Sequence, residues 1–323
     1  MGVHSEPEFA TPSEFLEHVR SAYAVPRAHA TPDREMLRLT HASLEELGLP
    51  PPDPANPYDT VIRDLTDQVA AGFQSRCGVD VSQSCGIGAL DHPSVNARCF
   101  RSRHAHYAIV LHHGLMTLLH KHSKLLTAAV MPSKVVYCNR KDPRLLTSEE
   151  LVSWSAELGP IYRAIGETKG AMVKLAPEAS VIAGTMLTLG EAFVLGHEIG
   201  HMVSGHLDDP SRFVPDETLP WLEFFAENAL HEDEFEADAH GFEAMRDYSE
   251  STSMSVVLGA VVSTFAVLSL IGAGEPSRTH PSAMDRIHRL VERHFSAETA
   301  RLVHRWIDQD DREAAIAALT TAH

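Results

Sequence analysis

Two histidines and a glutamate in the stretch His197-Glu-Ile-Gly-His201 are the residues best suited to chemistry. Histidines at positions i and i+4 of a helix lie one above the other on a single face, so both rings are able to bind one metal ion. Glu198 is rotated by about 100° from His197 around the same helix. We therefore expect its carboxylate to lie beside the ion, where it acts as a general base and takes a proton from a bound water.

The motif alone is weak evidence, because the chain is rich in histidine. It holds 21 histidines among 323 residues, and a random sequence of this composition contains an H-E-x-x-H motif about 0.1 times. A third ligand is required as further evidence, since a catalytic zinc ion takes three protein ligands and keeps one position for water.

Two known patterns supply the third ligand in different ways. The metzincin pattern requires Gly seven residues and His ten residues after the first histidine, but those positions hold Ser204 and Leu207. The gluzincin pattern requires a glutamate on a following helix, and Glu234 stands 33 positions after His201 in a helical stretch. Asp238 shares a face with Glu234 and is predicted to accept the second N–H of a ligand histidine.

Three separate pieces of the sequence resemble the gluzincin metallopeptidases, a family that includes HtpX-like proteases and CAAX prenyl proteases. That family typically shows H-E-x-x-H with another His nine residues after the first, then E-[FY]-x-A-D, then T-H-P followed by an R-I pair. Here the matching positions are residues 197–201 with His206, residues 234–238, and residues 279–281 with Arg286 and Ile287. The resemblance covers residues 187–295, about a third of the chain.

The resemblance implies a mainly α fold of the α+β class, with a zincin-like helical core and a small sheet beside the metal-binding helix. It also implies zinc-dependent hydrolysis of peptide bonds, with one Zn²⁺ bound by His197, His201 and Glu234.

Three further residues near these motifs have less certain roles. His280 either donates to a developing oxyanion as a catalytic residue or caps the helix that follows Pro281. Arg286 is predicted to be structural. His206 is expected to point away from the metal face and to make an exposed or helix-end contact.

The patterning predicts an N-terminal segment, residues 1–57, that ends in a Pro-rich connector, and a peptidase-like domain, residues 58–323. Apolar spacing and capping residues predict most of the second part to be helical. The expected helices are residues 58–73, 147–166, 187–207, 220–248, 281–295 and 297–319; residues 107–111 are an expected strand, and residues 75–103 an expected loop. Residues 254–273 are uncharged and about long enough to cross a membrane, but we favour a buried core helix.

Charge and cysteine content restrict the partners and the compartment. The chain has 27 Lys+Arg against 44 Asp+Glu, a formal net charge of −17, which argues against nucleic acid or an anionic membrane surface as the main partner. Residues 208–250 alone hold 14 acidic and two basic residues, so the alternative for Glu234 is one more charge on a solvated face. Four irregularly spaced cysteines and a start without a secretory pattern favour reduced thiols and a cytoplasmic location.

A second histidine-rich stretch spans residues 104–122. Its six histidines are His104, His106, His112, His113, His120 and His122. Their spacing matches no standard ligand set, so we expect surface or packing roles rather than a second metal site.

Our leading hypothesis is a soluble zinc metallopeptidase that acts on a peptide or protein substrate. One alternative is an amide-processing hydrolase dedicated to a single pathway, since a fold does not fix the substrate. The other is a non-catalytic zinc-containing sensor or binding protein. A retained base at Glu198 argues against that alternative, because a structural zinc site needs no base and fills all four positions.

Overall fold

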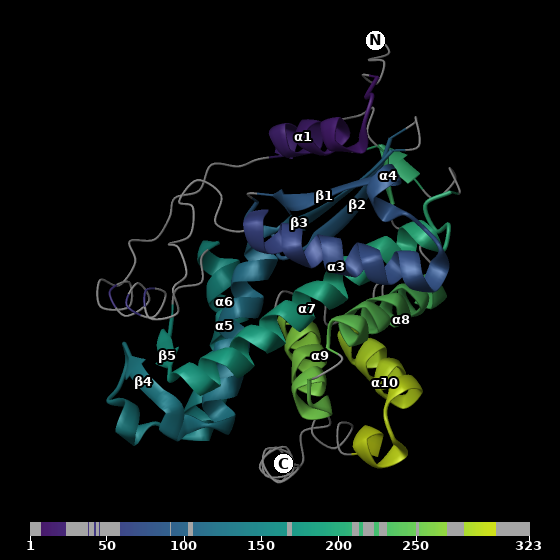
Figure 1. The fold of residues 1–323 in the computed structure, drawn as a ribbon. Helices are drawn as coiled ribbons and strands as arrows, with labels where there is room; N and C mark the ends of the chain where they lie inside the picture. The colour runs from purple at the N-terminus through teal and green to yellow at the C-terminus, as the bar shows by residue number, and fades with distance from the viewer. Residues whose placement is uncertain are drawn as a thin grey trace.

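The computed structural model describes residues 8–23, 38, 42, 45, 59–90, 92–102, 106–166, 170–208, 213–215, 223–225, 231–249, 252–269 and 281–301. Within these ranges helices predominate and the strands form one five-stranded and one two-stranded sheet, which confirms the expected mainly α fold with a small sheet (Figure 1). The principal helices are α1 (Pro12–Tyr23), α3 (Asp59–Cys77), α4 (Val81–Ser84), α5 (His113–Val130), α6 (Ser148–Ile165), α7 (Pro177–Val203), α8 (His231–Tyr248), α9 (Met254–Leu268) and α10 (Ala283–His294).

The five-stranded sheet has the order β1-β3-β2-β7-β6. Its strands are β1 (Cys85–Leu90), β2 (Ala97–Arg101), β3 (Tyr107–His112), β6 (Phe213–Pro215) and β7 (Glu223–Phe225); β1 and β3 are parallel and the other pairs antiparallel. The smaller sheet pairs β4 (Val135–Cys138) with β5 (Val173–Leu175).

Helices cover both faces of the larger sheet. Helix α1 lies on one face, and α3 and α7 lie on the other (Figure 1). Successive side chains of a strand point to opposite faces. Accordingly, Ala108 and Val110 of β3 pack in the cluster under α1, whereas Ile109 and Leu111 belong to the main core. Burial on both sides explains the nearly continuous apolar run that predicted this strand.

The predicted loop over residues 75–103 is wrong. Helix α3 continues to Cys77, and α4, β1 and β2 occupy much of the remainder. The Gly, Ser and Cys content suggested irregular structure, but sheet pairing with β3 and burial of β1 and β2 override that local preference.

Helix α7 begins at Pro177, ten residues before the predicted start, and ends at Val203, four before the predicted end. Most of its residues are buried, since helices, β2 and β3 pack around it. A helix that is apolar on all sides carries no periodic signal to mark its ends. In the described part of the chain, α7 is the helix that is long and apolar enough to cross a membrane. However, 61% of its most apolar stretch is buried inside the protein.

Other predicted elements have mixed outcomes. The capping box of Thr147 and Glu150 is confirmed at the start of α6. The helix predicted for residues 220–248 is wrong at its start, because residues 223–225 form β7 and α8 begins at His231. Residues 254–268 form the buried helix α9, which packs on α5, α7 and α10 as expected of a core helix. The cysteines are free thiols, three of them buried.

Several predictions fall outside the described residues. They concern the Pro-rich connector before Tyr58, the chemistry of His104 and His280, and most of the helix predicted for residues 297–319.

Candidate metal centre

Close packing of α7 on α8 builds the site. A methyl group on Gly196 would lie 2.5 Å from the Cβ of Ala244, and one on Gly241 would lie 2.6 Å from the carbonyl oxygen of Phe193. The two helices approach so closely because these positions carry no side chain. Helix α7 brings the two histidines of the motif to this interface, and the first turns of α8 bring Glu234 and Asp238.

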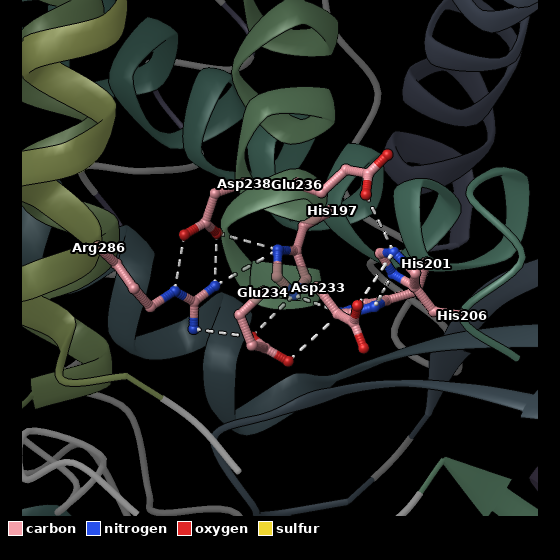
Figure 2. A network of polar contacts seen from close by, with 8 residues as sticks. All are labelled: His197, His201, His206, Asp233, Glu234, Glu236, Asp238 and Arg286. Carbon is pink, nitrogen blue, oxygen red and sulfur yellow. Dashed lines mark hydrogen bonds and ion pairs between the residues drawn. The ribbon is translucent and has the colours of Figure 1, made fainter. Parts of the chain in front are cut away.

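His197, His201 and Glu234 converge on one point (Figure 2). The Nε2 atoms of the two histidines are 3.1 Å apart. Glu234 places Oε2 at 3.6 Å from Nε2 of His197 and Oε1 at 3.5 Å from Nε2 of His201. All three side chains are buried, so the spacing expected from sequence brings together three potential ligands away from bulk water.

Asp238 fixes the orientation of His197. Its Oδ1 lies 3.0 Å from Nδ1 of His197, as a hydrogen-bond acceptor for the ring. A neutral imidazole that donates from Nδ1 has its lone pair on Nε2. The predicted contact between Asp238 and a histidine of the motif is therefore present, and it turns the lone pair of His197 toward the point of convergence.

Arg286 of α10 neutralises the buried carboxylates. It donates to Asp238 from Nε at 2.8 Å and from a terminal nitrogen at 2.5 Å, and its other terminal nitrogen is 3.4 Å from Glu234 (Figure 2). Burial disfavours the charge of Arg286, but the carboxylates of Asp238 and Glu234 raise its pKa above the usual value. Burial likewise opposes ionisation of Asp238, whose pKa the Arg286 charge and hydrogen bonds hold below its usual value.

The electrostatics at the point of convergence favour a cation. Burial raises the pKa of Glu234, but the hydrogen bond to His201 and the charge of Arg286 outweigh it and hold the pKa well below the usual range. Burial lowers the pKa of His201, and the bond to Glu234 together with its charge reverses that effect. A buried carboxylate thus draws positive charge to the atoms that face it.

The donor set fits zinc in kind and in spacing. Zinc binds histidine nitrogen at about 2.0–2.1 Å and carboxylate oxygen at about 2.0–2.2 Å, so tetrahedral ligands stand about 3.3–3.5 Å apart. The observed separations of 3.1–3.6 Å lie close to that range. Two imidazoles and one carboxylate are also a known catalytic zinc set. Among the described residues, the group of His, Cys, Asp or Glu side chains close enough to hold a metal ion is His197, His201 and Glu234, hereafter the metal trio.

Glu198 lies on α7 between the two histidines and is less buried than they are. Its negative charge raises the pKa of His201 and of Arg286. It also adds to the rise in the pKa of Cys99 of β2, which is caused mainly by burial. The carboxylate therefore acts electrostatically on both the metal trio and the neighbouring strand.

The prediction for His206 is partly wrong. It does lie just beyond the helix end, but it is buried and its Nδ1 is 3.0 Å from Nδ1 of His201. The prediction assumes a helix through residue 207, whereas α7 ends at Val203 and the chain turns back. Sequence reasoning also missed Glu236, whose Oε2 lies 3.3 Å from Nε2 of His206.

Three histidines of residues 106–122 form packing contacts. Nδ1 of His112 contacts Ser94 Oγ, Nδ1 of His122 lies 2.8 Å from Ser263 Oγ, and His106 contacts a backbone carbonyl. No metal-binding group involves them in the described structure. The contacts of His106, His112 and His122 agree with the expected packing roles.

A family model described as Peptidase U49 matches residues 140–306, just over half of the chain. The chain belongs to the Peptidase U49 family. This is a family of peptidases, and the substrate of a peptidase is a peptide or protein. The Peptidase U49 match contains the metal trio, Asp238 and Arg286, whereas the β1-β3-β2 part of the sheet precedes it. Comparisons with curated proteins and with solved structures gave no match.

Proposed function

We propose that this Peptidase U49 member is a zinc-dependent endopeptidase of the gluzincin type. The observation that carries the proposal is the convergence of His197 Nε2, His201 Nε2 and the Glu234 carboxylate at separations of 3.1–3.6 Å. Family membership supports the peptidase part, and the donor set supports the metal part.

A zinc ion held by this trio would polarise the scissile carbonyl and lower the pKa of a bound water. Glu198 accepts the proton of the attacking water and returns it to the leaving amine, which is the work of a general base followed by a general acid. Asp238 keeps the Nδ1 proton on His197, so that Nε2 stays available as a ligand. Arg286 keeps Asp238 and Glu234 ionised in a buried environment.

Two features favour catalysis over a purely structural metal site. Structural zinc sites normally use four protein ligands, while the trio offers three. Glu198 is also partly exposed next to buried ligands, as a base that meets both water and substrate must be. A non-catalytic sensor would need neither feature. For His280, which lies outside the described residues, both predicted roles stay open: a donor to the oxyanion or a cap of the helix that follows Pro281.

The deciding experiment compares Glu198→Gln with the wild type. The variant should bind one zinc ion with unchanged affinity, as measured by chelator competition. Its cleavage of a quenched fluorescent peptide library should fall by about 10³-fold or more, since both proton transfer and charge stabilisation are lost.

The matched control is Glu178→Gln on the same helix. Glu178 is exposed and pairs with Lys134, so its replacement should leave cleavage within about twofold of the wild type. Full activity of the zinc-loaded Glu198→Gln protein would refute the proposed role of Glu198. A zinc-loaded wild type that cleaves no peptide of a proteome-derived library would favour the sensor alternative.

A further inference from the structure

His206 reaches the metal trio through a tight turn after α7. Ser204 caps the helix, and Gly205 adopts φ +71°, a left-handed conformation that glycine accepts at little cost. The backbone N–H of His206 then donates to the carbonyl oxygen of His201 at 3.1 Å. This turn folds the His206 side chain back against the second metal histidine.

The His206 ring bridges His201 and two carboxylates. Its Nδ1 is 3.0 Å from Nδ1 of His201, and the two rings meet edge to face with centroids 5.2 Å apart. Its Nε2 is 3.3 Å from Oε2 of Glu236 and 3.7 Å from Oδ1 of Asp233. His206 is only 6% exposed, so these contacts replace water.

The protons on the two rings determine which nitrogen donates in the bonds of His206 to His201 and to Glu236. Two Nδ1 atoms at 3.0 Å form a hydrogen bond only if one of them carries the proton. Nε2 of His206 faces carboxylates, which only accept, so it is the protonated nitrogen of a neutral ring. Nδ1 of His206 is then the acceptor, and His201 donates to it from Nδ1. In the zinc-loaded protein, this arrangement would leave the Nε2 lone pair of His201 for the ion.

We infer that His206, backed by Glu236, is a positioning residue that holds His201 in the tautomer and ring orientation needed to bind the metal. The inference rests on the proposed metal site and deepens it. His197 is held directly by a carboxylate, Asp238. His201 is held instead by the neutral imidazole of His206, which donates its own N–H to Glu236. Outer partners of this kind commonly change metal affinity by about 10- to 100-fold.

The test uses two substitutions at one position. His206→Phe keeps a ring of similar size but no acceptor, and it should weaken zinc binding by about 10- to 100-fold. His206→Asn retains an acceptor oxygen close to the position of Nδ1 and should recover most of the affinity. Zinc affinity is measured on the full chain by chelator competition, and the unfolding temperature of each zinc-free protein is measured in parallel.

His240→Phe is the matched control. His240 is half-buried nearby on α8; its Nε2 contacts Ser204 Oγ at 3.3 Å and its ring packs at a tilt against Phe73, so these contacts are with residues outside the trio of His197, His201 and Glu234. Its replacement should change stability without changing zinc affinity. Equal losses of affinity in His240→Phe and His206→Phe would make the role of His206 structural and overturn the inference.

A spectroscopic measurement on the wild type decides the matter even if a variant does not fold. Nitrogen-detected NMR of the imidazoles in the zinc-loaded chain should show His201 protonated at Nδ1 and His206 protonated at Nε2. The opposite arrangement, with His206 donating from Nδ1, would overturn the inference. A wild type that binds no zinc at all would instead refute the proposed function, so the two failures are distinguishable.

Discussion

The described histidines of residues 92–122 and those of residues 197–206 are both crowded and mostly shielded from water, but their neighbours differ. His112 and His122 contact serine hydroxyls, and burial lowers their pKa values to about 3 and about 4. Around residues 197–206, in contrast, carboxylates from α8 lie within 3.0–3.6 Å of the rings. The comparison teaches that acidic side chains from a second helix, and not the density of histidine, distinguish the group that could hold a metal ion.

The largest effect should come from removing the acidic ligand. Glu234→Ala should weaken zinc binding by more than about 100-fold, because a ligand itself is lost. Replacing a residue that only orients a ligand typically costs about 10- to 100-fold. Metal analysis after gel filtration measures the loss. Glu232→Ala, an exposed carboxylate two residues earlier, should retain one zinc per chain. Zinc retained by Glu234→Ala would remove the difference between the two histidine groups.

Arg286→Met tests the cation that accompanies the carboxylates. The variant leaves Asp238 and Glu234 buried without their guanidinium, which should cost about 3–5 kcal/mol of unfolding free energy in the zinc-free protein. Urea denaturation measures this cost. The exposed pair of Arg289 and Glu232 is the control, and Arg289→Met should cost about 1 kcal/mol or less. Equal costs for the two variants would contradict a special role of the buried cation.

Glu191 shows what a buried carboxyl does without such a cation. It forms no ion pair in the described structure, and burial alone raises its pKa to about 8. The folded protein keeps this proton to a higher pH than the unfolded chain, so Glu191 lowers stability as pH rises between about 4.5 and 8. Glu191→Gln should remove about 2 kcal/mol of pH-dependent loss between pH 6 and pH 7.5.

Parallel urea denaturation curves at both pH values check the Glu191 prediction. Glu178→Gln, exposed on the same helix, should follow the wild type at each pH. A Glu191→Gln protein with the same pH dependence as the wild type would show that Glu191 is ionised in the folded state.

The smallest effect is expected in the packing group. His122→Leu removes one hydrogen bond and leaves Ser263 near Ser123 Oγ at 3.4 Å, which should cost about 1 kcal/mol in thermal or chemical unfolding. Zinc content should stay unchanged. A loss of bound zinc in this variant would place the residue 92–122 histidines within the metal chemistry and break the comparison.

The site was more predictable from the sequence than the fold around it. Fixed helical spacing placed His197 and His201 on one face, and a second helical pair put Glu234 beside Asp238. His206 was misplaced because its position depends on where α7 stops, which is set by the turn at Gly205. Strand β7 replaced part of a predicted helix because its pairing partner, β2, lies more than a hundred residues earlier in the chain. Such long-range pairing leaves no local periodic signal.

The proposed ion would also link two helices, because the trio takes its residues from both α7 and α8. Glu234 follows His201 by 33 positions, so an ion shared by α7 and α8 closes a loop of that length. An ion that binds the folded chain and not the unfolded chain would stabilise the fold by about 4 kcal/mol at a free concentration roughly 1,000 times its Kd. Chelation should therefore do more than stop the proposed cleavage: it should also remove this stabilisation and weaken the connection between α7 and α8.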